Sequence, residues 1–81
     1  MRAIILDGRD IEYSGEVHQA ILPGRDGEFS VLDFHQPFLY RLRKGIIKIQ
    51  ETEKNEEEKI VAIRDGLARF RDNELLVMKE K

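Results

Sequence analysis

The sequence contains no cysteine, only two prolines and no long apolar run. Without cysteine, the chain can form neither disulfides nor thiolate metal sites, and it has no cysteine nucleophile. Its longest apolar runs, such as Leu75 to Met78, are four residues long, whereas a membrane-spanning helix needs roughly 20. We therefore expect a core without covalent cross-links, and membrane association only through a partner.

The chain also lacks an excess of positive charge. It has 14 lysines and arginines against 16 aspartates and glutamates, for a net charge of −2. Because a nucleic-acid-binding domain ordinarily carries a basic face, nucleic acid is not an expected partner. Hydrophobic residues make up 41% of the chain and charged residues 37%, which suffices for one core in a single domain over residues 1–81.

The apolar residues that are present occur in short segments of strand length, at residues 3–6, 17–22, 29–32, 46–49, 60–63, 67–70 and 75–78. Asp-Gly dipeptides lie between them at residues 7–8, 26–27 and 65–66. Asp-Gly favours turns in which two successive residues have positive φ, so each dipeptide predicts a tight turn. Many short strands separated by turns predict an all-β fold, a small β-sandwich or barrel.

Alternation within two segments predicts which side chains face the core. Residues 17–22 are predicted as one strand, in which Ala20 and Leu22 share a face. In residues 45–50, Ile47 and Ile49 likewise share one face of the strand, opposite Ile46 and Lys48.

The stretch from Glu51 to Lys59 has seven charged residues in nine and no apolar residue. With no face to bury, it is predicted to be the exposed tip of a long hairpin. A short helical turn within the tip stays open as an alternative.

No recognisable catalytic or metal-binding pattern is present. His18 and His35 are the only histidines, and their spacing, even with Asp33 or Glu28 added, matches no zinc signature. No Ser-x-Gly elbow and no paired carboxylates suggest an active site. "GRDG" at residues 24–27 lacks the Lys-Ser/Thr and the helix of a phosphate loop, which favours a β-turn. We expect no catalytic residue, no metal and no cofactor.

Aromatic residues and a histidine surround the second proline. Phe29, Phe34, Phe38 and Tyr40 could form a base-stacking platform, but no dense basic groove accompanies them, so packing at the core and its edge is preferred. Pro37 interrupts a sheet ladder. His35 is therefore predicted to satisfy loop backbone groups with its ring nitrogens, or else to contact a partner.

Read as a whole, "LPGRDGEFSVLDFHQPFLYRLRKGIIKI" resembles the epsilon subunit of rotary F-type ATP synthases, in its amino-terminal domain. The matching residues, without a gap, are Pro23, Gly24, Gly27, Glu28, Val31, Leu32, His35, Pro37, Leu42, Gly45, Ile47 and Ile49. The likeness extends upstream through residues 13–17 and downstream through residues 59–78. The family commonly has Gly where Ser30 stands, Pro-Gly where Asp33-Phe34 stand, and a second Gly where Asp65 stands, which affects loop conformation rather than the fold.

The resemblance implies a β-sandwich of roughly eight to ten strands, at the base of the rotating central stalk. It implies a non-catalytic part that transmits proton- or sodium-driven rotation between the c ring and the gamma subunit, on the cytoplasmic face of the bacterial inner membrane. The residues that match the c-ring-facing loop are Arg25, Asp26, Gly27 and Glu28. Those that match the segment against gamma are Phe34, His35, Gln36, Pro37 and Phe38. An exposed apolar patch of Phe34, Phe38 and Leu39 is expected there.

The family usually continues into a two-helix carboxy-terminal domain, which this sequence lacks. Those helices carry inhibition of ATP hydrolysis and ATP binding, so the resemblance implies neither activity here. Two alternatives stay open: a freestanding β-barrel that binds an oligosaccharide or single-stranded nucleic acid, and a regulator that inhibits ATP hydrolysis without the helices.

Overall fold

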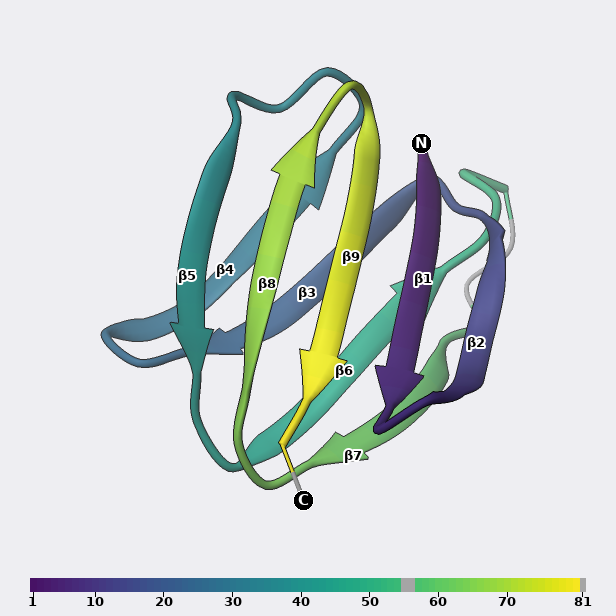
Figure 1. The fold of residues 1–81 in the computed structure, drawn as a ribbon. Helices are drawn as coiled ribbons and strands as arrows, with labels where there is room; N and C mark the ends of the chain where they lie inside the picture. The colour runs from purple at the N-terminus through teal and green to yellow at the C-terminus, as the bar shows by residue number, and fades with distance from the viewer. Residues whose placement is uncertain (55–56, 81) are drawn as a thin grey trace.

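The computed structural model describes residues 1–54 and 57–80, and over these residues it contains nine strands and no helix (Figure 1). The strands are β1 (Arg2–Asp7), β2 (Asp10–Glu16), β3 (Gln19–Gly24), β4 (Gly27–Leu32), β5 (Phe38–Leu42), β6 (Gly45–Gln50), β7 (Lys59–Ile63), β8 (Gly66–Arg71) and β9 (Glu74–Lys79). The prediction of an all-β fold is confirmed.

The strands form one continuous sheet that folds over into two layers, which cross each other in Figure 1. The front layer has the order β2-β1-β9-β8-β5. In the back layer β3 pairs with β4 along one edge and with β6 on the other, and β7 completes the layer beside β6. β1 and β9, from opposite ends of the chain, run parallel, whereas the other pairs are antiparallel. The fold is the expected β-sandwich.

Two corners carry the chain from one layer to the other. Arg43 and Lys44 separate β5 in the front layer from β6 in the back layer, and Arg64 and Asp65 separate β7 from β8. A Cβ atom on Gly66 would lie 2.6 Å from the Met78 carbonyl oxygen, so a glycine is needed where β8 starts beside β9. The Asp65-Gly66 dipeptide thus marks a corner, and the predicted tight turn there is wrong.

The hairpin turns differ in conformation from the prediction. The β1–β2 turn has Gly8 and Arg9 at its centre, and only Gly8 has a positive φ, 64°. The β3–β4 turn has neither central residue at positive φ. In the described residues, Asp72 and Asn73 are the central pair that both adopt positive φ, 52° and 55°, as a type I′ turn requires. This turn was not predicted, because the pair lacks glycine.

The core lies between the two layers. Its fully buried large side chains are Ile5, Leu22, Val31, Leu42, Ile47, Ile49, Phe70, Leu75 and Val77. The predicted alternation is confirmed for Ile47 and Ile49, and Ala20 and Leu22 are also buried together. The single strand predicted over residues 17–22 is wrong, because β2 ends at Glu16 and β3 begins at Gln19. At this crossing between layers the Val17 N–H donates to the Met1 carbonyl oxygen (2.8 Å).

The acidic stretch between β6 and β7 is the tip of a hairpin, as predicted. Residues 51–54 and 57–58 are exposed and not helical, while positions 55 and 56 lie outside the described residues. The Tyr13 hydroxyl donates to the Glu51 carboxylate (2.6 Å), and the Lys59 ammonium lies 5.6 Å from the centre of the Tyr13 ring. Partial burial, together with the Glu51 carboxylate, raises the pKa of Tyr13 to about 12. These contacts connect β2 of the front layer to the back layer.

Candidate binding surfaces

The two segments predicted to contact partners lie at opposite ends of β4 and β5 (Figure 1). We call residues 24–28, which include the β3–β4 turn and the strand residues beside it, the hairpin tip, and residues 33–37, which join β4 to β5, the histidine loop. A strand of six residues spans about 20 Å. β4, which pairs with β3 over its whole length, therefore separates the two segments, and one molecule could hold a different partner at each end.

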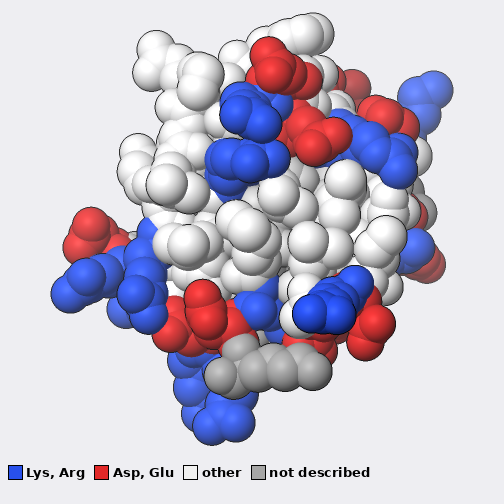
Figure 2. All heavy atoms as spheres, viewed as in Figure 1, with Lys and Arg blue, Asp and Glu red and all other residues white. Residues whose placement is uncertain are grey.

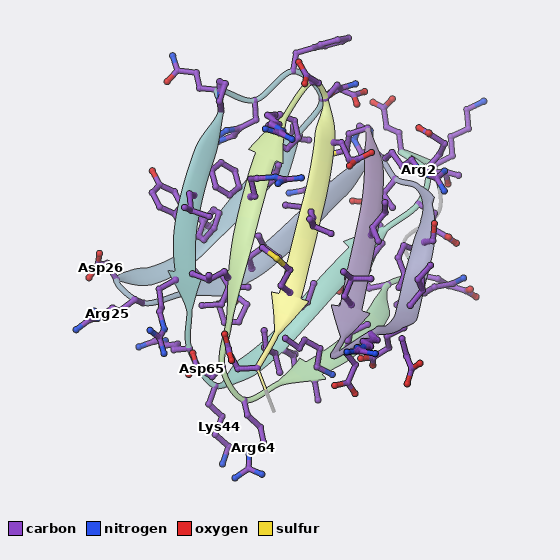
Figure 3. The ribbon with its side chains drawn as sticks, viewed as in Figure 1. Arg2, Arg25, Asp26, Lys44, Arg64 and Asp65 are labelled. Carbon is purple, nitrogen blue, oxygen red and sulfur yellow. The ribbon has the colours of Figure 1, made fainter. Side chains whose placement is uncertain are left out.

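The hairpin tip presents charges of both signs on a fixed backbone. Arg25 and Asp26 are exposed and project from the end of the molecule (Figure 3), and neither forms an ion pair with a described residue. The Arg25 N–H donates to the Arg41 carbonyl oxygen (3.1 Å), which ties the tip to β5. A groove of about 420 Å³ lies between the tip and β5, with Phe29 and Tyr40 in its wall. Such a surface suits a polar partner.

Two glycines of the hairpin tip are required for different reasons. A Cβ atom on Gly24 would lie 2.7 Å from the Gly27 carbonyl oxygen and 2.8 Å from the Phe29 ring, so Gly24 is fixed by lack of space. Gly27 has open space around its Cα but a φ of 134°, so it is fixed by its backbone conformation.

Side chains from other elements hold the histidine loop. The Phe34 N–H donates to Asn73 Oδ1 (2.8 Å) on the β8–β9 turn. The Asp33 carboxylate accepts a hydrogen bond from the Met1 ammonium group, which holds the pKa of Asp33 below its usual range. The ring of His35 contacts the Gln36 carbonyl oxygen through Nδ1 (2.8 Å). This contact agrees with the prediction that His35 satisfies a loop backbone group, and its contact with a partner stays a prediction.

Phe34 combines an unfavourable backbone conformation with an exposed side chain. Its φ is 60°, a region that costs a non-glycine residue about 1–2 kcal/mol, and 82% of its surface is accessible. Its ring therefore gains little from the isolated domain to offset this cost. Phe34 stands where the epsilon subunits that the sequence resembles commonly have glycine. The loop thus keeps a positive φ, which favours glycine, while it exposes a phenyl ring.

The other aromatic residues form a cluster at the open edge between β4 and β5. The Phe29 ring meets those of Phe38 and Tyr40 edge-on, at 5.6 and 5.3 Å between centroids. Phe38 stacks on Phe70, and His35 lies edge-on to both. Packing at the core edge, which the sequence favoured over a base-stacking platform, is confirmed for Phe29, Phe38 and Tyr40 but is wrong for Phe34, which is 82% exposed. Phe38 is only partly exposed, so its expected place in an exposed patch is wrong.

A further surface, which the sequence did not predict, covers the outside of the front layer. Cross-strand neighbours share a face of a sheet, and the register aligns Leu67 of β8 with Met78 of β9, Leu6 of β1 and Ile11 of β2. The adjoining row contains Leu39, Leu76 and Ile4, with Arg69 between Leu39 and Leu76. We call the seven apolar residues of these two rows the outer apolar face; white side chains occupy the centre of this side in Figure 2. The unbroken apolar runs of β1 and β9 could have indicated it, because such runs place apolar side chains on both faces.

In the described residues no group of three or more histidines, cysteines or carboxylates could hold a metal ion. Over the same residues no helix is long and apolar enough to cross a membrane. The described residues form a β-sandwich domain with exposed surfaces at two ends and on the front layer.

Comparison with known proteins gives the family of this domain. The model of the family described as "ATP synthase, Delta/Epsilon chain, beta-sandwich domain" matches residues 1–81. The chain belongs to this family, and the resemblance inferred from its sequence motif is confirmed.

Curated relatives carry the name ATP synthase epsilon chain. The relative from Leptospira interrogans serogroup Icterohaemorrhagiae serovar copenhageni (strain Fiocruz L1-130) is 29% identical over 80 residues, and that from Bradyrhizobium sp. (strain ORS 278) is 37% identical over 70 residues. The matches cover 99% and 86% of this chain, but 61% and 50% of the two relatives. The chain therefore spans only part of the length of these relatives.

Two solved assemblies contain a chain with the same fold. In the Euglena gracilis mitochondrial ATP synthase (OSCP/F1/c-ring) the TM-score is 0.86 at 16% identity, covering 98% of this chain and 49% of that one. In the Tetrahymena thermophila mitochondrial ATP synthase (central stalk/c-ring) the TM-score is 0.80 at 12% identity, covering 99% and 63%. At these identities the likeness shows the fold alone.

Proposed function

We propose that this chain is the β-sandwich part of an epsilon subunit in the central stalk of an F-type ATP synthase. It binds the gamma subunit, rests on the ring of c subunits, and transmits ion-driven rotation between them without catalysing a reaction itself. Family membership and the names of the curated relatives support this role. The complex would hold the chain at the cytoplasmic face of a bacterial inner membrane, as a peripheral subunit.

The observation that carries the proposal is the placement of two dissimilar surfaces at the two ends of β4, which pairs with β3 over its whole length. The charged hairpin tip and the apolar Phe34 lie at opposite ends of β4. A part that transmits torque needs two attachment points that cannot move relative to each other. The sandwich supplies this rigidity through its continuous sheet and the aromatic cluster.

The chemistry of each surface suggests its partner. A fixed turn with Arg25, Asp26 and Glu28 suits the polar loops of a c ring, since charge-assisted hydrogen bonds form without burying apolar area. Phe34 and the outer apolar face, which includes Leu39 at 63% exposure, suit gamma, because a permanent interface is more apolar than the remaining surface. We therefore assign the gamma contact to the histidine loop and to this face.

Co-purification of the tagged chain from its own cells tests the proposal, with gamma and c subunits expected among the bound proteins. Phe34→Gly should sharply lower recovery of gamma. Since glycine suits a φ of 60°, this variant should unfold with a free energy within about 1 kcal/mol of the wild type, or higher. Ile60→Ala is the matched control, because it removes a comparably exposed apolar side chain, 60%, from β7 of the back layer.

The double variant Asp26→Asn, Glu28→Gln should instead lower recovery of c subunits while gamma is retained. Recovery of neither partner by the wild-type chain, under conditions that preserve the synthase, would overturn the proposed function. Addition of the chain to an epsilon-depleted ATPase separates coupling from inhibition, and we expect hydrolysis to continue at the same rate.

A further inference from the structure

Three connections that are far apart in the sequence bring cations together at one end of the molecule. Arg25 comes from the hairpin tip, Arg43 and Lys44 from the β5–β6 corner, and Arg64 from the β7–β8 corner. With Arg41 they line one open depression of about 470 Å³. We call Arg25, Arg43, Lys44 and Arg64 the basic corner.

The charge of this corner is not neutralised within the described chain. Asp65 is the carboxylate that lines the depression, and Arg41 binds both of its oxygens, at 3.1 and 2.7 Å. Asp26 and Glu28 line one adjoining depression, and Asp7 and Glu80 line the other. None of the four side chains of the basic corner forms an ion pair with a described residue. Four free cations therefore sit together on a chain whose net charge is −2.

The basic corner is one pole of a charge asymmetry. β6 starts at this corner and runs to the acidic turn at the other end of the sandwich, and β7 returns from that turn to the corner (Figure 1). The acidic β6–β7 turn exposes Glu53 and Glu58 among other charged residues. An anionic surface would attract the basic corner and repel this acidic turn, so it would orient the molecule as well as bind it.

The cationic side chains diverge rather than converge. In Figure 3, Lys44 and Arg64 extend side by side away from the molecule, while Arg25 extends in a different direction from the hairpin tip. A site for one small anion needs donors that point to a common centre. Diverging cations on exposed loops instead match many negative charges spread over a surface. This geometry favours a lipid surface over a single phosphate group.

We propose that the basic corner binds the phosphate groups of an anionic phospholipid membrane surface directly. This inference rests on the proposed function in one respect only, since that function places the chain beside a membrane-embedded ring. The hairpin tip carries Arg25 and Asp26 at the same end as the corner, so lipid and ring contacts would be made together. The lipid contact adds to attachment through the ring, and its strength falls with salt because the side chains are exposed.

Vesicle flotation with the 81-residue chain tests the proposal. Vesicles that mix phosphatidylcholine and phosphatidylglycerol should bind the chain at low salt, and vesicles of phosphatidylcholine alone should not. High salt should release it. Lys44→Gln with Arg64→Gln should weaken the partition coefficient by about fivefold for each cation removed. Both side chains are exposed and unpaired, so neither substitution should impair folding.

The matched control is Lys54→Gln with Arg71→Gln, which makes the same change in net charge at the opposite end of the sandwich. Equal weakening in this control would show that net charge alone acts, and would overturn the proposal, as would equal binding to uncharged vesicles. Saturable binding of inorganic phosphate at matched ionic strength, lost in Lys44→Gln with Arg64→Gln, would indicate a small-anion site instead. If the chain did not bind anionic vesicles while gamma and c subunits still co-purified with it, only the lipid contact would be refuted.

Discussion

The hairpin tip and the histidine loop end the same strand but are built in opposite ways. Backbone contacts and two glycines shape the hairpin tip, which exposes the charged side chains of Arg25 and Asp26, and neither of these forms an ion pair with a described residue. The N-terminal ammonium group of Met1 and the Asn73 side chain of the β8–β9 turn hold the histidine loop, which exposes the apolar side chain of Phe34. The first segment owes its shape to its own sequence, whereas the second depends on the rest of the fold.

This difference predicts where each segment tolerates change. A surface made of exposed charges on a fixed turn can alter its side chains without loss of stability, because surface substitutions usually change the free energy of unfolding by less than about 0.5 kcal/mol. Its glycines, however, cannot change. The histidine loop should respond most to substitutions at distant positions that touch it.

The largest effect is expected from Gly24→Ala. The added methyl group would overlap the Gly27 carbonyl oxygen and the Phe29 ring, and such overpacking typically costs about 1–3 kcal/mol. Urea denaturation followed by circular dichroism measures this cost. Arg25→Ala, at the adjacent position, is the control and should leave the midpoint unchanged. A fall of equal size in both variants would mean that the tip does not owe its shape to its glycines.

A smaller effect is expected from Asn73, which supports the histidine loop from a distance. Asn73→Ala removes the acceptor for the Phe34 N–H and places alanine at a φ of 55°, a combined loss of about 2 kcal/mol. Asn73→Gly keeps the type I′ turn and removes only the acceptor, so it should lose about half as much. Hydrogen exchange of the Phe34 amide should accelerate in both variants. An unchanged exchange rate would show that Asn73 does not hold the loop.

The fold could be predicted from the sequence because most of its strands coincide with short apolar segments. β2 and β5 do not coincide with any of those segments. Most side chains of β2 are exposed, so it has no apolar run, and β5 follows a proline loop that obscures where the strand starts. The Asp-Gly signal located turns without fixing their type, since the type I′ turn falls on Asp72 and Asn73.

The candidate surfaces could be predicted from the sequence only in part. The family motif located the hairpin tip and the histidine loop, but not the hydrogen bond from the Phe34 N–H to Asn73, which lies far along the chain. The outer apolar face requires the parallel pairing of β1 with β9. The basic corner requires three separate connections to meet. Each of these features combines residues whose proximity exists only after folding.

The smallest effect is expected from Asp65→Asn, at the same end of the molecule as the hairpin tip. Arg41 holds the pKa of Asp65 below its usual range. The contribution of this ion pair is therefore present above the pKa of Asp65 in the unfolded chain, and is lost as the pH falls through the lower pKa of the folded state. Because the pair is exposed, the urea midpoint of the variant should fall slightly at neutral pH and match the wild type in acid.

The same substitution should strengthen binding to anionic vesicles, because it frees the Arg41 guanidinium and removes the carboxylate that lines the basic depression. Asn still offers an oxygen to the Gly66 N–H, which Asp65 Oδ1 accepts at 2.8 Å, so the β7–β8 corner should keep its shape. A variant less stable at neutral pH yet better bound to lipid would show that charge at this end serves contact with a surface more than it serves the fold. At the histidine loop the reverse holds, since Asp33 and Asn73 both stabilise the loop backbone. Weaker binding by Asp65→Asn would contradict the electrostatic basis of the lipid contact.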